Sequence, residues 1–361
     1  MRISYNSIPF RFFIIFTACL CVYFAIQKMK PSHSNESSNI DKLPNEDEVL
    51  KLFQQWKKQH GRVYNDLDEM SMKFATFVTN LKYITKTNAK RASPHSAVLG
   101  LTNFADWSFE EFKETYMTMK TDTTDIVNDG DVDKSPCSDP PSSVDWVAKG
   151  AVTPVMTQGS CDSCWAISVA GAIEGLVKIT TNKLIGLSAQ ELVDCDKKSS
   201  GCAGGYRPNA FKWVIGNKGL ALGSKYPYKT VKGDCKSSKI PVSASSNINA
   251  YKQVEQSDLG LLCAVAKQPI SVGIYAATED FQHYSHGIYE GPNCPVDSKT
   301  STHAMLIVGY HSVDGQDYWI VKNSCGTEWG MAGYAYIKRN TGKKYGVCAI
   351  NASAFRPFKN K

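Results

Sequence analysis

The stretch "QGSCDSCWAIS", residues 158–168, places two cysteines three positions apart, immediately before an apolar segment that is predicted to be helical. Three kinds of chemistry use such a pair. The cysteines could bind a metal, act as a redox dithiol, or combine a nucleophile with a structural disulfide. The rest of the sequence distinguishes these possibilities.

The metal and redox interpretations lack the partners that they need. A zinc site requires a second C-x-x-C or a His pair at ligand spacing, and the sequence contains neither. A redox dithiol usually lies in a βαβ unit, which the pattern does not predict. Cys164, in contrast, falls where the helix begins, and there unpaired N–H groups and the helix dipole favour a thiolate. We therefore expect a nucleophilic Cys164 and no metal or other cofactor.

A nucleophilic cysteine also needs a base and a group that orients the base. The stretch "STHAMLIVGY" places His303 at the head of a predicted apolar strand. The stretch "YWIVKNSCGTEWG" ends a predicted strand at Asn323, whose side-chain amide is suited to holding an imidazole. These two residues complete a candidate catalytic group.

Around this group, helical patterns precede strand patterns. A 3.6-residue period follows Cys164, and "LSAQELVDC" begins with a predicted capping box, Ser188 with Glu191. Strands are predicted for "PISVGIYA", "HAMLIVGYHS", "DYWIVKNS" and "GYAYIKR". Helices first and strands later indicate an α+β protein with a two-part body and a cleft between the parts.

Upstream, residues 121–143 are acidic and contain Pro-Pro, the composition of an exposed, cleavable linker. Residues 30–47 are polar and are expected to be a flexible lead-in. Between these segments, six residues recur at helical spacing and are predicted to share one helix face. They are Glu69, Lys73, Phe77, Asn80, Ile84 and Asn88.

The bulk properties place the chain in the secretory pathway. Arg2 and Arg11 flank an N-terminal region followed by the apolar residues 12–26, which predicts a signal peptide and leaves a retained signal anchor open. Secretion suits the 12 cysteines of the chain. The net charge of +7 is spread without a basic run, so no nucleic-acid partner is expected.

Several motifs in order resemble the papain family of cysteine proteases, in its cathepsin L-like plant form with an inhibitory prosegment. In the body these are Gln158, "CDSCW", "LSAQELVDC", "GCAGGY", "THAMLIVGY" and "KNSCGTEWG". The upstream helix is similar to the prosegment motif E-x3-R-x3-F-x2-N-x3-I-x3-N, with Lys73 in place of Arg. "GLTNFAD" resembles a second prosegment motif and keeps Gly100, Phe104 and Asp106.

The resemblance implies a role for each matching residue. Cys164 is the nucleophile, His303 the base, and Asn323 the residue that orients the imidazole. Gln158 and the backbone N–H of Cys164 stabilise the oxyanion. The fold implied is papain-like, with a helical half, a β-barrel-like half and the active-site cleft between them. The residues implied to bind substrate are Gly204, Gly205, Tyr206, Arg207 and Ala304.

Disulfide pairing does not follow from the spacing, since six cysteines allow fifteen arrangements. The resemblance implies the pairs Cys161–Cys202, Cys195–Cys235 and Cys294–Cys348. Cys263 is expected to be a small buried apolar residue. Cys137 lies at the expected cleavage boundary, and we expect it to be lost on maturation.

The resemblance also implies the domain plan. We expect a signal peptide or anchor over residues 1–26, an inhibitory prosegment over 27–139 and a monomeric mature peptidase over 140–361. Its partners would be protein or peptide substrates, the prosegment and cystatin-type inhibitors. Its location would be the vacuole or lysosome, or outside the cell. Asn35 and Asn351 lie in glycosylation sequons. Acids such as Asp106 are expected to protonate below about pH 5 and loosen the prosegment.

Three residues depart from the family pattern. Asp162 stands where Gly is usual; its charge would disfavour the Cys164 thiolate but stabilise the His303 imidazolium, so the sequence leaves its net effect open. Cys325 replaces a Trp that shields the bond between Asn323 and His303. Arg207 replaces a neutral or apolar residue, and we expect it to favour acidic or polar groups at the second position before the cut. These departures leave an alternative, a weak or inactive homologue that acts as a binding or storage protein.

Overall fold

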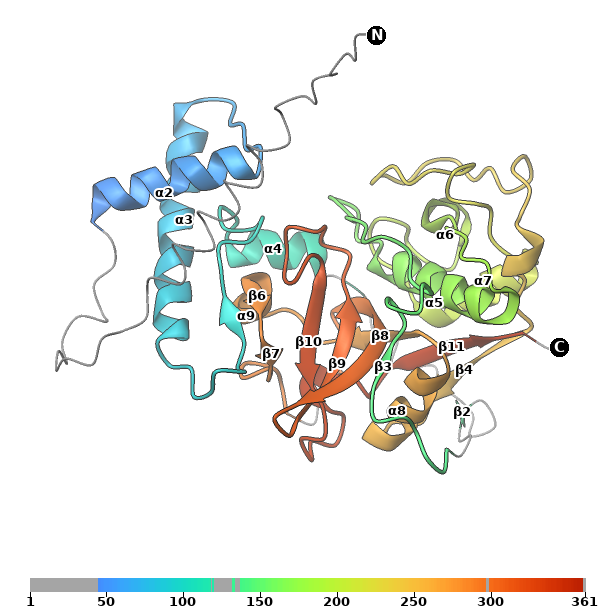
Figure 1. Ribbon diagram of the computed structural model, residues 1–361. Helices are drawn as coiled ribbons and strands as arrows, with labels where there is room; N and C mark the ends of the chain where they lie inside the picture. The colour runs from blue at the N-terminus through green and yellow to red at the C-terminus, as the bar shows by residue number, and fades with distance from the viewer. Residues whose placement is uncertain (1–44, 118, 120–131, 134–136, 297–298, 360–361) are drawn as a thin grey trace, which may run out of the picture. The chain divides into compact units, whose positions relative to one another are not determined.

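The computed structural model describes residues 45–117, 119, 132–133, 137–296 and 299–359 (Figure 1). The predicted signal peptide or anchor, residues 1–26, and the sequon at Asn35 lie outside these ranges. The expected lead-in, residues 30–47, reaches the described residues only at its end, where α2 already begins.

Up to Met119, the described part of the prosegment consists of three helices and one short strand. They are α2 (Glu46–Gln59), α3 (Leu67–Asn88), β1 (Val98–Leu99) and α4 (Phe109–Tyr116). The side chain of Asn45 caps α2 and that of Ser108 caps α4, each in a capping box. Helix α2 was not predicted from the sequence.

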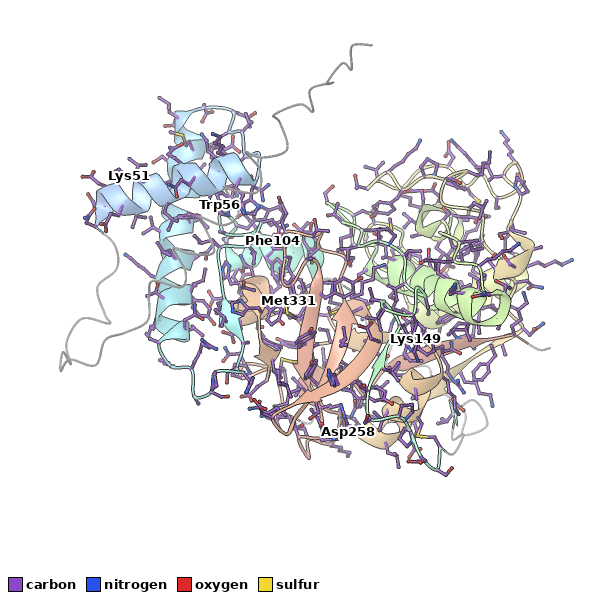
Figure 2. All side chains as sticks on the ribbon, in the orientation of Figure 1. Lys51, Trp56, Phe104, Lys149, Asp258 and Met331 are labelled. Atoms are coloured by element: carbon purple, nitrogen blue, oxygen red, sulfur yellow. A yellow bond between two sulfur atoms is a disulfide. The ribbon has the colours of Figure 1, made fainter. Side chains whose placement is uncertain are left out.

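The prosegment has a small core of its own. Phe53 and Phe77 are fully buried, and Trp56 is buried with its indole N–H donating to the main-chain oxygen of Thr102 at 2.9 Å (Figure 2). Phe104 and Tyr116 instead join the main core of the molecule. The prosegment is therefore a folded unit that also packs into the peptidase body.

The predicted face of α3 is confirmed by its contacts. Phe77, Asn80 and Ile84 are buried. The polar members of the face hold other parts of the prosegment: Lys73 Nζ lies 2.6 Å from Glu111 Oε1, Asn80 Nδ2 donates to the oxygens of Ala105 and Trp107, and Asn88 Nδ2 donates to that of Leu99.

The helices of the peptidase body are α5 (Cys164–Thr181), α6 (Ala189–Cys195), α7 (Arg207–Gly216), α8 (Asp258–Lys267) and α9 (Glu279–Gln282). Among the described residues, α5 alone is long and apolar enough to span a membrane, but most of it is buried, as in the core helix of a globular protein. Ser188 Oγ caps α6 by accepting from Glu191 N at 3.0 Å. The Glu191 carboxylate accepts from Ala221 N instead, so only half of the predicted capping box forms.

A nine-stranded sheet carries the rest of the body. Its strands follow the order β2-β4-β11-β5-β8-β9-β10-β7, and β3 also pairs with β8. Their bounds are β2 (Val132–Asp133), β3 (Val144–Asp145), β4 (Ala250–Val254), β5 (Ile270–Ile274), β7 (Ile288–Tyr289), β8 (His303–Val313), β9 (Gln316–Lys322), β10 (Tyr334–Lys338) and β11 (Ala354–Phe358). A separate pair joins β1 to β6 (Tyr284–His286).

The predicted α+β class is confirmed. Figure 1 shows helices α5 to α7 grouped apart from strands β8 to β10, and the four predicted strands correspond to β5, β8, β9 and β10. Helix α5 approaches β8 closely, because a Cβ at Gly171 would lie 2.9 Å from Leu306 Cδ2. The catalytic candidates lie along this contact, since Cys164 begins α5 and His303 begins β8.

The expected linker, residues 121–143, is exposed at residues 138–139 and 141–143, but other parts of it are bound to the body. Val132 and Asp133 pair with β4, and Val144 and Asp145, just after the expected linker, pair with β8. Cys137 forms a disulfide with Cys263. Cys263 is buried as expected, but it is half of a disulfide rather than a small apolar residue, because pairing depends on three-dimensional proximity across 126 positions of sequence.

Candidate active site

Cys164 is the first residue of α5 and is completely buried. Its sulfur accepts from the backbone N–H of Ala304 at 3.3 Å, and the thiol donates to Asp162 Oδ1 at 3.6 Å. Burial and the Asp162 carboxylate raise the pKa of the Cys164 thiol well above its usual value. With the prosegment in place, the structure therefore favours the neutral thiol.

His303 and Asn323 are brought together by the antiparallel pairing of β8 and β9. His303 opens β8, and Asn323 directly follows β9. Their side chains meet at 2.8 Å between His303 Nε2 and Asn323 Oδ1. Burial lowers the pKa of His303 to about 4, although the bonds to Asn323 and to the Tyr116 carbonyl act in the opposite direction. The imidazole is thus oriented by both contacts, and its burial disfavours the charged form.

Gln158 is fully buried next to this pair. Its Oε1 accepts from Ser324 Oγ at 2.7 Å, and its backbone N–H donates to the Ser324 carbonyl at 2.8 Å. These two bonds fix the amide. Its Nε2 is a buried donor that has no hydrogen-bond partner in the described part of the chain. A donor held this way is available to an oxyanion.

The prosegment covers the site. The carbonyl oxygen of Tyr116 lies 3.1 Å from His303 Nδ1. Met119 packs with Cys164 and Ala304, and its N–H donates to the Thr302 carbonyl at 3.2 Å. These contacts leave no access to the catalytic sulfur, and sequence analysis did not identify either Tyr116 or Met119.

Asp162 and Cys325 both lie at the catalytic group. The Asp162 carboxylate lies 3.6 Å from the Cys164 sulfur and raises the pKa of that thiol, which is the expected effect on the thiolate. Cys325 is fully buried, and burial raises the pKa of its thiol while a hydrogen bond with Asn323 opposes this. The backbone oxygen of Cys325 accepts from Asn103 of the prosegment at 3.3 Å.

Two of the expected substrate-binding residues lie next to Cys164 or to the residue that follows it. Ala304 bonds to the sulfur directly. Gly205 allows a close approach, because a Cβ there would lie 2.4 Å from Trp165, the residue after Cys164. Gly204 is buried and Tyr206 is half-buried immediately before α7.

Arg207 is the first residue of α7 and is only 2% exposed. Its Nη2 donates to the carbonyl oxygen of Ser353 at 2.9 Å and to Ser353 Oγ at 2.6 Å, and its guanidinium carbon lies 5.2 Å from the centre of the Phe355 ring. Its Nη1 is buried without a partner among the described residues. Burial lowers the pKa of Arg207 to about 10.

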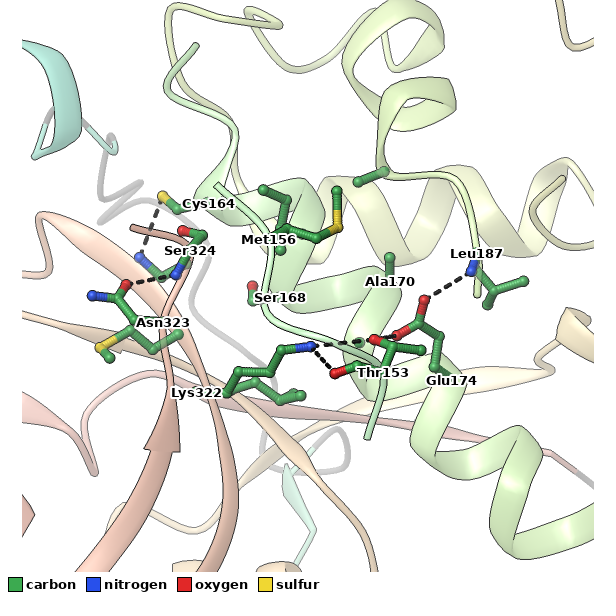
Figure 3. A pocket seen from close by; sticks show the side chains of 16 residues that line it. Thr153, Met156, Cys164, Ser168, Ala170, Glu174, Leu187, Lys322, Asn323 and Ser324 are labelled. Carbon is green, nitrogen blue, oxygen red and sulfur yellow. Dashed lines mark hydrogen bonds between the residues drawn. The ribbon is translucent and has the colours of Figure 1, made fainter. Parts of the chain in front are cut away.

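Behind the catalytic group, a polar network joins the two parts of the body (Figure 3). The Glu174 carboxylate on α5 accepts from Leu187 N at 2.8 Å and from Thr153 Oγ1 at 2.7 Å. Lys322, which precedes Asn323, donates to the Thr153 carbonyl at 2.7 Å. Burial raises the pKa of Glu174 and lowers that of Lys322. Sequence analysis did not identify this network.

The disulfides of the structure include the three pairs that the resemblance implied, Cys161–Cys202, Cys195–Cys235 and Cys294–Cys348. Cys161 therefore fixes the loop beside Cys164. The sequon at Asn351 is not supported: the side chain is 1% exposed, and Nδ2, the atom that carries a glycan, donates to Asp258 Oδ1 at 2.9 Å. Within the described ranges, no group of three or more His, Cys, Asp or Glu side chains is placed to hold a metal ion.

Two families match the chain. Residues 140–358 match the papain family cysteine protease, and residues 53–112 match the cathepsin propeptide inhibitor domain (I29). Papain from Carica papaya is 41% identical over 358 residues, covering 96% of this chain and 97% of papain.

Solved structures of proforms agree with these matches. The recombinant stem bromelain precursor superimposes with a TM-score of 0.77 at 36% identity, covering 87% of this chain and 100% of that one. The proform of Amb a 11, a ragweed pollen cysteine protease, gives a TM-score of 0.79 at 32% identity over 91% of this chain and 99% of that one.

Proposed function

Because the chain belongs to the papain family of cysteine proteases, we propose that Cys164 is the nucleophile and His303 the acid–base group of a peptidase that the prosegment keeps inactive. The arrangement that carries this proposal is the pair of His303 and Asn323, joined at 2.8 Å, next to a cysteine that begins a helix. The three roles of a Cys-His-Asn triad are filled by residues on α5, β8 and the end of β9.

In the proposed reaction, Cys164 gives its thiol proton to His303, and the resulting thiolate attacks the carbonyl carbon of the scissile peptide bond. The negative charge moves to the carbonyl oxygen, where Gln158 Nε2 and the backbone N–H of Cys164 donate hydrogen bonds. His303 then protonates the leaving amine, the C–N bond breaks, and a thioester remains on Cys164. Water, deprotonated by His303, attacks the thioester and releases the acid and the thiol.

Asn323 acts on this cycle through His303. Asn323 Oδ1 is hydrogen-bonded to His303 Nε2, so the other ring nitrogen of His303, Nδ1, is directed away from Asn323. In the precursor, Nδ1 faces the carbonyl of Tyr116. We propose that Nδ1 exchanges the proton with Cys164 and substrate once the prosegment has left.

The subsite residues follow from the same placement. We propose that Gly204, Gly205, Tyr206 and Ala304 contact the substrate backbone and side chains near Cys164. Arg207 would define the pocket for the second residue before the cut. Arg207 forms no salt bridge with the described residues, and its Nη1 has no hydrogen-bond partner among them. An acidic side chain of the substrate could therefore pair with the buried guanidinium.

For the chain as a whole, we propose a signal peptide or anchor over residues 1–26 and secretion to a vacuole, a lysosome or the outside of the cell. Residues 27–139 would form the precursor segment, and residues 140–361 the monomeric mature body. Inhibitors of the cystatin type, which act on the exposed site, are proposed as further partners. The contacts of Val132, Asp133 and Cys137 with the body argue for a cut earlier than this expected boundary.

The alternative of an inactive binding or storage protein is not favoured, since the triad is complete. The test is peptide hydrolysis by the precursor after incubation at pH 4 and at pH 7. We expect activity to follow prosegment removal at pH 4, and Cys164→Ala to abolish it. Gln158→Ala should lower kcat by about 10²–10³ with little change in KM. A fully processed wild-type chain that hydrolyses no peptide in a broad library would overturn the proposal.

A further inference from the structure

Val132, Asp133 and Cys137 lie upstream of the expected boundary at 139–140, yet all three are bound to the peptidase body. Val132 and Asp133 form β2, which pairs in parallel with β4: Val132 lies opposite Gln253 and Asp133 opposite Val254. In the nine-stranded sheet, β2 is the edge strand beyond β4. Removing it would expose the backbone edge of β4.

A buried salt bridge holds the same segment. Arg356 Nη2 on β11 lies 2.5 Å from Asp133 Oδ2, and the two side chains are only 6% and 7% exposed. Burial lowers the pKa of Arg356, and Asp133 opposes this effect. The described residues provide no other salt bridge to Arg356. Loss of Asp133 would therefore leave a buried cation without its carboxylate, which is costly.

The third link is covalent. Cys137 is bonded to Cys263, which is buried on α8, and the two Cα atoms are 5.6 Å apart. A cut on the C-terminal side of Cys137 would therefore leave the prosegment attached to the body by this bond. Such a product could not release the inhibitory residues, which reach at least Met119.

We propose that activation cuts the chain upstream of Val132, so that the active enzyme keeps the edge strand β2 and the Cys137–Cys263 disulfide. This inference rests on the proposed activation of the precursor. The match to the peptidase family begins at residue 140, so the retained segment is an N-terminal addition to the matching region. It replaces the expectation that Cys137 leaves on maturation.

The direct test is the N-terminal sequence and intact mass of the enzyme activated at pH 4, measured with and without reduction. We expect one chain that starts at or before Val132. Under denaturing, non-reducing conditions it should show two free thiols, Cys164 and Cys325. An N-terminus downstream of Val132 would overturn the inference. A third free thiol, at Cys263, would show that Cys137 has been lost, and this would also overturn the inference. A second chain released by reduction would show a cut after Cys137 and would overturn it as well.

Failure of this inference and failure of the proposed function are distinguishable. If the wild-type precursor does not process itself, the proposed function fails. Digestion of the Cys164→Ala precursor with thermolysin would still test the inference. The resistant core should begin at or before Val132, and a core that begins at 140 would contradict it.

Matched variants test whether the segment is retained by its contacts. In the activated enzyme, Asp133→Asn should lower Tm by several degrees, because Arg356 loses its charged partner. Asp139→Asn, which changes an exposed acid on the same segment, should leave Tm unchanged. Equal Tm values for the two activated variants would show that residues 132–139 do not support the mature fold.

Discussion

Nδ1 of His303 lies 3.1 Å from the carbonyl oxygen of Tyr116, so a main-chain group of the prosegment occupies one side of the catalytic imidazole. The ring is fully buried there, and burial lowers its pKa from 6.5 to about 4. Between these pH values the covered site keeps His303 neutral, whereas a site opened to water takes up a proton. Acid therefore favours release of the prosegment.

Asp106 does not provide this acid sensitivity, contrary to the sequence-based expectation. It is 2% exposed and accepts from Tyr64 OH at 3.0 Å, and burial raises its pKa. A carboxyl with a raised pKa binds its proton more tightly in the folded state than in the unfolded state. Its protonation therefore stabilises the folded prosegment, and that contribution is lost as pH rises.

His283 is predicted to add to the acid response. It is 1% exposed at the contact with the prosegment, where its carbonyl accepts from Gly100 N at 2.8 Å and Tyr83 of α3 faces its ring. Burial lowers the pKa of His283 from 6.5 to about 3. Between these pH values His283 is neutral while the prosegment is docked, and it takes up a proton once it is exposed to water. Acid therefore favours undocking. The nearby acids Glu279 and Asp280 on α9 do not reverse this direction.

The measurement is the pH at which precursor processing reaches half its maximal rate. We expect His283→Leu to move this midpoint to lower pH, because the leucine takes up no proton on release. His311→Leu, at an exposed position on β8, is the control and should leave the midpoint unchanged. Identical midpoints for wild type and His283→Leu would contradict the argument.

Asp162 is predicted to suppress the catalytic thiolate. Its carboxylate lies 3.6 Å from the Cys164 sulfur and raises the pKa of that thiol. Asp162→Asn keeps the size of the side chain and removes the charge, so the thiol pKa should fall. The check is the pH dependence of iodoacetamide alkylation of the activated enzyme. A profile that does not move to lower pH would refute the assignment.

Cys325 is predicted to limit turnover. Its thiol bonds to Asn323 but covers less of the Asn323–His303 contact than an indole would. In the activated enzyme, Cys325→Trp should raise kcat more than it changes KM, because a better-held imidazole acts mainly in the transition state. Cys325→Ser is the size-matched control and should give no gain. If the Trp variant has the kcat of wild type while Cys164→Ala is inactive, then poor cover of the Asn323–His303 bond does not limit turnover.

Arg207 is predicted to select acidic or polar side chains at the second position before the cut. Its unpartnered Nη1 is a buried donor that an aliphatic substrate group would leave unpaired. Profiling with a peptide library should show Glu or Asp preferred by wild type and lost in Arg207→Met, which keeps an unbranched stem. A Leu or Phe preference in wild type would contradict the prediction.

The sequence predicted those parts of the fold whose evidence is local. Strands β5, β8, β9 and β10 and helix α5 follow from apolar periodicity, and Cys164 was placed at a helix start by the same pattern. Helix α2 was missed because it buries only Val49, Phe53 and Trp56, and these residues pack in the small core of the prosegment rather than in the main core.

What could not be predicted depends on distances between remote segments. The Cys137–Cys263 bond joins residues 126 positions apart, and no spacing rule identifies such a pair. The sign of the Asp162 effect required its distance from the sulfur. The positions of Tyr116 and Met119 at the catalytic group likewise appear only once the prosegment is folded onto the body.

The most direct test of the account is covalent labelling of Cys164 by an epoxide of the E-64 type, located by mass spectrometry of the peptide that contains it. The thiolate should open the epoxide and form one thioether at Cys164 after activation at pH 4, and no adduct should form at Cys164 while the prosegment is bound. A processed, folded enzyme in which Cys164 remains unlabelled, or a precursor labelled as rapidly as the processed enzyme, would contradict the central claim.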